Sequence, residues 1–218
     1  MLKLKITIFA LLICFTTASV AQVTNHIVEP TGVYKDINVA ADNNLVQDLA
    51  NAKKDKQAKL IQQIIAEPNK HNPVVLYALS AVLFKADRKD EASFWFYVAQ
   101  LRTRYDFNRC TDKTTAGPVA QVNATFGPDI NNYAFKNLDT LEKTVGKVVD
   151  FVRSNKEEYD QRWLNLTGMG AFDQVSVGKE GKPLSLPANE WAAIKAKTID
   201  DYYNDFKEAL AGMRAKRK

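Results

Sequence analysis

The stretch LYALSAVLFKADRKDEASFWFYVAQLRTR, residues 76–104, decides the fold of this chain. Its apolar residues recur at spacings of three and four on both sides of a polar turn at residues 87–90, which is the spacing of one helical face. Asn72 and Pro73 precede it, and asparagine is a favoured N-cap while proline suits the first helical turn. The stretch therefore predicts two antiparallel helices joined by a tight turn.

Four aromatic residues stand in a row in the second of these helices: Phe94, Trp95, Phe96 and Tyr97. Successive helical residues turn by about 100° around the axis, so the four rings span about 300°. One neighbouring element cannot pack against all of them. Either several elements enclose the helix, or some rings stay exposed and anchor a partner.

The first 21 residues have the features of a secretory signal peptide. Two lysines precede an apolar run at residues 6–15, and Ala21 closes a small-x-small cleavage pattern. We therefore expect an exported protein with cleavage near Ala21. The apolar run is too short for a stable membrane span, so none is expected after cleavage. A lipid anchor would require a small residue directly before Cys14, where the chain has Ile13.

The mature chain should carry little net charge and one cysteine. Removal of Lys3 and Lys5 lowers the formal charge from +5 to +3, and part of the remainder lies in the basic tail at residues 214–218. A nucleic acid is therefore not an expected partner. Cys14 leaves with the signal peptide, so Cys110 has no internal partner for a disulfide. We expect a half-buried thiol there, and a fold stabilised by a packed core.

Periodicity divides the rest of the chain into helices and loops. Residues 22–40 show no helical period and are expected as an extended N-terminal arm or a loop, followed by one mainly α-helical domain over residues 41–218. Beside the helix pair, we expect helices near residues 42–67, 129–156 and 188–210. Residues 53–59 are either a polar interruption or a solvated face of the first of these. We also expect a loop over residues 106–128 with a short helical turn at 119–125, and a break at 167–187 in which residues 173–186 could form a small β-hairpin.

No residue pattern points to catalysis or to a cofactor. His26, His71 and Cys110 share no metal-ligand spacing, and the G-x-S-x-G nucleophile motif is absent. Carboxylate pairs such as residues 157–158 and 200–201 are neighbours in sequence, and we expect them on charged outer faces rather than across a substrate. We therefore expect no enzyme activity, no metal and no cofactor.

Small residues in the helix pair lie where two helices would approach closely. The positions concerned are Leu76, Leu79, Ser80, Leu83, Ala92, Phe96 and Ala99. In this pattern, about 30 of the 218 residues resemble the tetratricopeptide repeat superfamily, including its shorter Sel-like relatives. No second copy follows at the period of such repeats. Because a lone repeat cannot bury its own faces, the other helices should cover it.

Three further blocks carry a resemblance over the whole chain: SFWFYVAQLRTRY at residues 93–105, INNYAF at 130–135 and PANEWAAIKAKTIDDYYNDF at 187–206. They look like an uncharacterised family of small exported bacterial proteins that accompany type VI secretion effectors. The resemblance implies a periplasmic immunity protein that binds a secreted toxin. A periplasmic helical-repeat scaffold for cell-envelope proteins and, more remotely, an envelope-acting enzyme are the alternatives.

Inhibition by binding needs a complementary surface with a few anchor residues and a polar rim. The aromatic-basic segment at residues 94–105 and the acidic-aromatic run at 200–206 are the candidate surfaces for a protein partner. The candidate contact residues are Phe94, Trp95, Tyr97, Arg102, Arg104, Tyr105, Trp191, Tyr202 and Tyr203.

Overall fold

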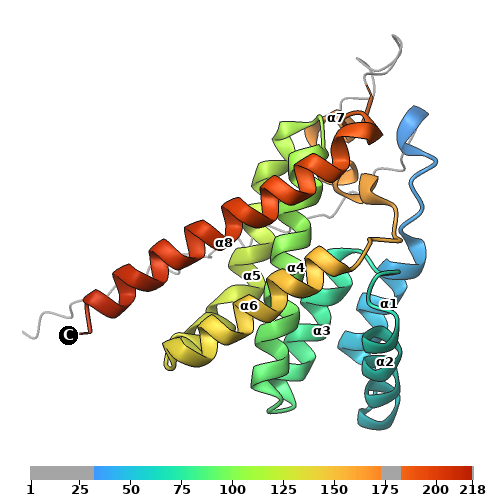
Figure 1. Ribbon diagram of the computed structural model, residues 1–218. Helices are drawn as coiled ribbons and strands as arrows, with labels where there is room; N and C mark the ends of the chain where they lie inside the picture. The colour runs from blue at the N-terminus through green and yellow to red at the C-terminus, as the bar shows by residue number, and fades with distance from the viewer. Residues whose placement is uncertain (1–31, 173–182, 218) are drawn as a thin grey trace, which may run out of the picture.

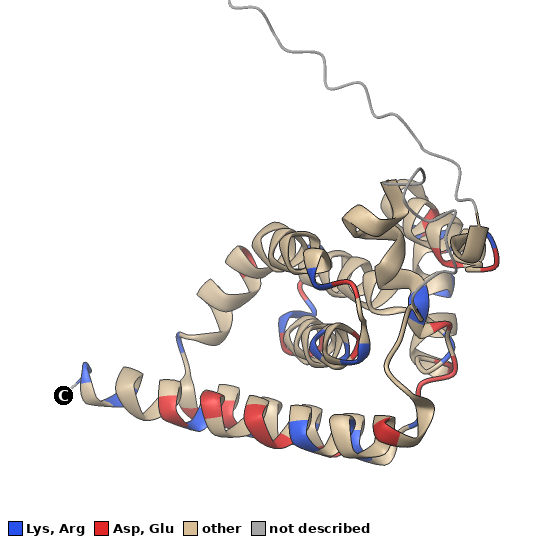
Figure 2. Ribbon diagram, turned by 90° about the horizontal axis from the view of Figure 1, so that it is seen from above, with Lys and Arg blue, Asp and Glu red and all other residues tan. Residues whose placement is uncertain are grey.

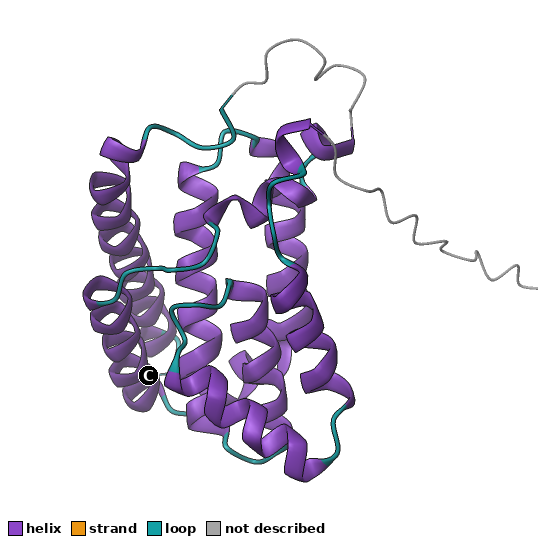
Figure 3. Ribbon diagram, turned by 90° about the vertical axis from the view of Figure 1, so that its right-hand side faces the viewer, coloured by secondary structure: helices purple, strands orange, loops and turns teal. Residues whose placement is uncertain are grey.

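The computed structural model describes residues 32–172 and 183–217, and over these ranges the chain forms helices and no strand (Figure 3). This confirms the mainly α-helical fold predicted from periodicity. The α-helices are α1 (Ala40–Asn51), α2 (Lys54–Ala66), α3 (Pro73–Lys85), α4 (Lys89–Arg109), α5 (Ala116–Ala134), α6 (Leu138–Ser154), α7 (Met169–Phe172) and α8 (Trp191–Ala215). Short 3-10 helices cover η1 (Gly32–Tyr34), η2 (Lys113–Thr115), η3 (Gln161–Thr167) and η4 (Ala188–Glu190).

Helices α3 and α4 form the hairpin expected from residues 76–104. Asn72 is the N-cap of α3, and its side chain accepts a hydrogen bond from the amide of Val74. The turn after α3 contains Asp87 with a φ of 61°, a left-handed conformation that aspartate tolerates. Ser80 and Ala92 are fully buried, and the Ser80 hydroxyl donates to the carbonyl of Tyr77 inside its own helix. Small residues with satisfied polar groups thus allow close packing of the pair.

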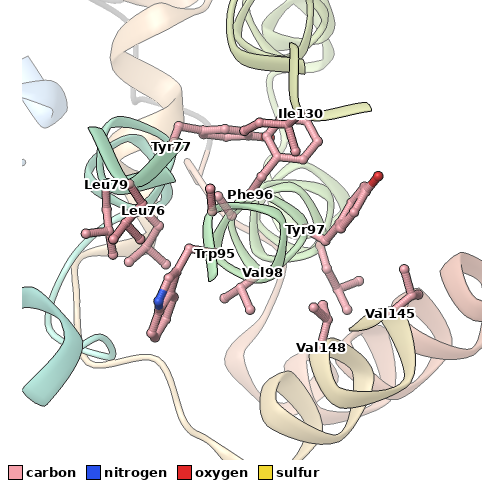
Figure 4. Packing of buried hydrophobic residues seen from close by; sticks show 14 of the residues in the cluster. Leu76, Tyr77, Leu79, Trp95, Phe96, Tyr97, Val98, Ile130, Val145 and Val148 are labelled. Atoms are coloured by element: carbon pink, nitrogen blue, oxygen red, sulfur yellow. The ribbon is translucent and has the colours of Figure 1, made fainter. Parts of the chain in front are cut away.

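Helix α4 lies at the centre of the bundle, where α3, α5, α6 and α8 all contact it (Figure 1). Its side chains point outward in several directions, as Figure 4 shows for Trp95, Phe96, Tyr97 and Val98. The exposed fractions of Trp95, Phe96 and Tyr97 are 6%, 0% and 6%. Enclosure by several helices, the first of the two alternatives for the aromatic run, therefore applies to these three rings.

The loop expected over residues 106–128 is wrong. Helix α4 continues to Arg109, and α5 already begins at Ala116. Two of the residues that suggested a loop, Pro118 and Gly127, suit their positions in this helix. The amide-free Pro118 stands in the first turn, and at Gly127 an added Cβ would lie 3.3 Å from the ring of Phe96. Close approach to α4 thus accounts for the glycine.

Two further boundaries differ from the expectation. Asp129 lies inside α5, and Asn137 is the N-cap of the following helix, with its side chain accepting from the amides of Asp139 and Thr140. The helical region expected over residues 42–67 consists of two helices, which meet at a break at residues 52–53. Of the two alternatives for residues 53–59, the interruption therefore applies at their start.

In the described part of residues 22–40, a turn and a loop replace the extended arm. Gly32–Tyr34 form a 3-10 turn, Tyr34 and Ile37 are buried, and α1 begins at Ala40. The signal peptide expected over residues 1–21, the remainder of the arm and His26 lie outside the described residues.

A second, smaller core contains Cys110, Tyr159, Trp163 and Leu164. Cys110 is buried rather than half-buried, with an exposed fraction of 1%, and its Sγ donates to Oδ1 of Asn165 at 3.3 Å. The chain after residue 182 runs beside the end of α4, with an isolated antiparallel bridge between Cys110 and Ser185. Most of the expected hairpin, residues 173–182, lies outside the described residues, and the rest pairs with residues 109–111 instead.

The Asp112 carboxylate ties α7 to this second core. Its Oδ1 accepts from the amide and the hydroxyl of Thr114, and its Oδ2 accepts from the amide of Gly170 at 3.0 Å. Burial alone would raise the pKa of Asp112, but the donors of Thr114 and Gly170 outweigh burial and lower it.

The Asp112→Ala variant should therefore lose about 1–2 kcal/mol of unfolding free energy at neutral pH, the usual value of a lost cap. Because the folded-state pKa is lowered, the stabilisation exists above the unfolded-state pKa and disappears as the pH falls through the folded-state value. Urea unfolding of both proteins at pH 7 and at about pH 2 should show a difference that shrinks in acid. An equal difference at both pH values would contradict the assignment.

Within residues 32–172 and 183–217, no helix is both long and apolar enough to cross a membrane.

Candidate binding groove between α4, α5 and α8

The nine candidate contact residues fall into three groups and one outlier. Phe94 and Trp95 pack against α6, and Arg102, Tyr105 and Trp191 belong to a buried charged cluster. Tyr97, Arg104 and Tyr202 line a groove. Tyr203 of α8 is not among the lining residues, and its ring stacks on that of Phe206. The structure therefore brings only some of the nine candidate contact residues together at one site.

The first group is core. The rings of Phe94 and Trp95 each lie 5.6 Å from the ring of Phe151 on α6, in edge-to-face geometry. Trp95 is buried and Phe94 is half-buried. A surface anchor requires an accessible ring, so Trp95 does not serve as one in this structure.

The second group belongs to a buried cluster of three cations and two carboxylates. Arg109 donates to Asp106 at 2.6 Å, and its guanidinium lies 4.1 Å from the ring of Tyr105 and 4.8 Å from that of Trp191. Arg102 is fully buried and Tyr105 is 4% exposed. The prediction that these two residues contact a partner at the surface is therefore wrong. These residues join α4 to the N-terminal end of α8.

Glu157 is one of the two carboxylates of this cluster and lies near Lys195 and Arg102. Its carboxylate lies 3.0 Å from Nζ of Lys195 and 3.9 Å from Nε of Arg102. Its side chain is only 6% exposed, so the expectation of a solvated outer face at residues 157–158 is wrong for Glu157. Arg102 also donates to the carbonyl of Pro68 and to the side chain of Asn69, which fixes the loop before α3.

Asp106 is the most enclosed carboxylate of the cluster. Besides Arg109, it accepts hydrogen bonds from Nε1 of Trp163 at 2.7 Å and from the hydroxyl of Tyr159 at 2.9 Å. Burial raises the pKa of Asp106, and the charge of Arg109 together with the Trp163 and Tyr159 donors opposes that rise. Asp106 thus joins α4 to η3 through Trp163, and Arg109 joins α4 to α8 through Trp191, so the cluster is a structural joint between these three elements.

The third group lines a hollow of about 270 Å³ between α4, α5 and α8. Its floor is α4, and one wall is α5. Its other wall is the C-terminal half of α8, which crosses the bundle and projects beyond it (Figure 1). The lining residues are Tyr97, Gln100, Arg104, Asn131, Phe135, Tyr202, Asp205, Phe206, Ala209 and Met213.

Hydrogen bonds fix the polar groups of the groove floor. The Tyr97 hydroxyl donates to Oδ1 of Asn131 at 2.9 Å, and the Tyr202 hydroxyl donates to Oε1 of Gln100 at 3.0 Å. Burial raises the pKa of both tyrosines far above neutrality, so both remain neutral donors. Gln100 in turn donates to Asn123 of α5, which also accepts from Tyr77 of α3. The centre of the floor, at Tyr97 and Gln100, therefore presents uncharged polar groups that are held by hydrogen bonds.

The groove has an apolar interior and a charged edge. Phe135 is 38% exposed at the α5 wall. Arg104 and Asp205 form an ion pair of 2.8 Å between α4 and α8, with side chains 41% and 63% exposed. Such an arrangement suits recognition of an apolar side-chain row by contact, with charge at the margin for orientation.

Four lining residues at the α5 wall and the end of α8 were not among the predicted contact residues: Asn131, Phe135, Ala209 and Met213. A loop was expected over residues 106–128, so the helix that carries Asn131 and Phe135 was placed too late. A usable signal existed in α8, because Phe206, Ala209 and Met213 continue the spacing of three and four residues from Ile199 and Tyr202.

A smaller hollow of about 160 Å³ lies where α4 and α6 begin and α5 ends. Asp90, Ser93 and Thr140 are among its lining residues. The hydroxyl of Tyr133 donates to Asp90 at 2.8 Å across this region. This bond engages two of its polar side chains, and the hollow is smaller than the groove, so it makes a weaker candidate.

His71 and Cys110, which were weighed for metal binding and nucleophilic catalysis, lie apart from the groove. His71 contacts Asp42 at 3.0 Å, and Cys110 lies in the second core. Among residues 32–172 and 183–217, no three or more histidine, cysteine or carboxylate side chains gather in a way that could hold a metal ion.

Comparisons with protein-family models, with curated proteins and with solved structures gave no significant match.

Proposed function

We propose that this chain is a periplasmic immunity protein that neutralises a type VI secretion toxin by direct binding, without catalysis. The proposal combines the resemblance of residues 93–105, 130–135 and 187–206 with the groove, to which all three blocks contribute lining residues. Tyr97, Phe135 and Tyr202 come from one block each.

The observation that supports binding best is the groove between α5 and α8. Its floor is held by hydrogen bonds from four helices, so a partner would not have to order it. Its interior offers accessible Phe135, Phe206 and Met213, and aromatic or sulfur-containing side chains in a concave site are typical binding contributors.

The test is a growth-rescue assay, in which a toxin encoded by a neighbouring gene is produced in the periplasm together with this protein. Co-purification of the two proteins reports binding directly. The unchanged chain should restore growth and retain the toxin. A chain that neither binds nor protects would exclude the immunity function, and one that binds envelope proteins without protecting would favour the scaffold function.

The Ala209→Trp variant should lose protection, because the indole would fill the hollow between α8 and α5. Ala209 is exposed and lines the groove, so the larger side chain need not disturb the core. We expect affinity for the toxin to fall about thirty-fold or more, the effect of disrupting an interface centre. Titration calorimetry with the purified toxin measures it.

Ala211→Trp is the matched control, since Ala211 is exposed on the same helix and is not part of the groove lining. It should bind and protect like the unchanged protein. A chain without residues 2–21 should fold and bind in vitro but fail to protect cells. Equal loss in both tryptophan variants, or in neither, would remove the groove from the proposed function.

A further inference from the structure

The apolar seam of α8 is only half used by the fold. Ile199, Tyr202, Phe206, Ala209 and Met213 follow one another at spacings of three, four, three and four residues, the repeat by which one helix packs against another. Ile199 and Tyr202 are buried in the core. Phe206 and Met213 are half-buried, and Ala209 is exposed, in the groove wall. The C-terminal half of the seam thus faces the groove, and no helix within residues 32–172 and 183–217 covers it.

An acidic ridge runs beside this half of the seam. At about 100° per residue, Asp201, Asp205 and Glu208 fall along one flank of the groove-facing stripe of α8. Figure 2 shows bands of acidic residues along the middle of α8. Asp201 pairs with Lys197 one turn earlier, at 2.9 Å, and Glu208 is exposed.

The opposite margin of the groove offers little charge to balance this ridge. Helix α5 contains one charged residue, Asp129, and no basic residue. Three arginines near the groove are already engaged. Arg104 pairs with Asp205, Arg214 pairs with Asp139 and Glu142 of α6, and Arg217 donates to the carbonyl of Phe135 at the far end. Lys136 follows Phe135 directly after α5. The mouth of the groove is therefore acidic along α8 and nearly uncharged along α5.

We propose that the groove binds one amphipathic α-helix of the protein partner, with its apolar stripe between α8 and α5 and a basic flank against the acidic ridge of α8. This inference rests on the proposed function, and it specifies the partner's contacting element. The α8 wall extends from Tyr202 to Met213, which corresponds to about 16 Å or three helical turns. A partner helix of that length presents anchors at positions i, i+3 or i+4, and i+7.

Charge complementarity distinguishes this occupant from a second copy of the same chain. If α8 of another copy entered the groove, its own acidic flank would come with it, and like charges would face each other across the interface. A helix with lysine or arginine beside its apolar stripe gains attraction at the same positions. The groove thus favours a different chain of opposite charge pattern.

Three fluorescein-labelled peptides of equal length test the proposal on the purified full-length processed protein. One has a leucine stripe flanked by lysine, the second has the same stripe flanked by glutamate, and the third has the composition of the first in scrambled order. Fluorescence anisotropy at low salt should show the lysine peptide binding about ten-fold more tightly than the glutamate peptide, with the preference shrinking at high salt. The scrambled peptide should bind at least about ten-fold more weakly than the lysine peptide, because its apolar residues lie on no single face.

Variants separate the two parts of the recognition. The double variant Asp201→Lys, Glu208→Lys should remove or reverse the charge preference, whereas Asp129→Lys, on an exposed face of α5 directed away from Asn131, should leave it unchanged. Ala209→Trp should weaken both leucine-stripe peptides. Equal affinity for both charge patterns, binding of the scrambled peptide as tight as that of the lysine peptide, or insensitivity to Ala209→Trp would overturn the proposal.

The remaining outcomes keep this inference distinct from the proposed function. A dimer in sedimentation velocity that Ala209→Trp dissociates would assign the groove to a second copy and overturn the inference. Charge-selective peptide binding without protection from the toxin would retain the helix groove and reject the immunity function. Protection that depends on Ala209 but shows no charge preference would retain the function and reject the basic helix.

Discussion

The Asp106→Ala variant should lose about 3–5 kcal/mol of unfolding free energy, the cost of leaving a buried charge without its partner. The carboxylate of Asp106 is fully buried and holds Arg109 at 2.6 Å. It also accepts hydrogen bonds from Trp163 and Tyr159, so its removal leaves three buried donors without this acceptor. Equilibrium unfolding in urea should show a large fall in the midpoint.

The matched control is Asp205→Ala, which removes another aspartate–arginine pair that involves α4. The Arg104–Asp205 pair is exposed and similar in length, at 2.8 Å. Its loss should cost about 1 kcal/mol or less, because water replaces the partner. If the two variants lost equal stability, burial would not be what makes the Asp106 contacts important.

The Phe96→Ala variant should be destabilised by about 3–5 kcal/mol through the cavity that it leaves at the centre of the bundle. Phe96 is fully buried, with its ring 5.6 Å from that of Tyr77 and 5.2 Å from that of Tyr97. Gly127 of α5 lies directly against it, so neighbouring side chains have little freedom to fill the space. Urea unfolding measures the loss.

Phe94→Ala provides the comparison for this cavity. Phe94 is half-buried and touches the rings of Trp95 and Phe151 at one side of α4. We expect a smaller loss of about 1–2 kcal/mol, since less apolar area returns to water. A larger loss for Phe94→Ala than for Phe96→Ala would contradict the central position assigned to Phe96.

Periodicity predicted the helices in which apolar residues follow one face, and these were the α3–α4 pair, α6 and the final helix α8. It failed at α5, where Gly117, Pro118, Gly127 and Pro128 suggested a loop. Local preference is weak compared with tertiary packing, and Gly127 is favoured there by the ring of Phe96 pressing against it. No single-sequence rule contains that contact.

The site was predicted in part, for a related reason. Tyr97, Arg104 and Tyr202 were named as contact residues and do line one groove. Arg102 and Tyr105 were named beside them, but they turn into the buried cluster around Asp106 and Glu157. Side chains on one helix point in different directions, and the helices that surround α4 decide which of these directions are buried and which face the groove. That information resides in contacts between segments far apart in the chain.

The hydrogen bonds that link Tyr77, Asn123, Gln100 and Tyr202 also determine the axial register of the bundle. Apolar packing is non-directional, so a helix whose apolar residues repeat every three and four positions can pack against its neighbours in more than one axial position. A shift of α8 by one turn, about 5.4 Å, would break the hydrogen bond of 3.0 Å between Tyr202 and Gln100 and leave both groups without this partner. The same four side chains therefore position the two groove walls lengthwise, so that Phe135 on α5 stands opposite the end of α8 rather than its middle.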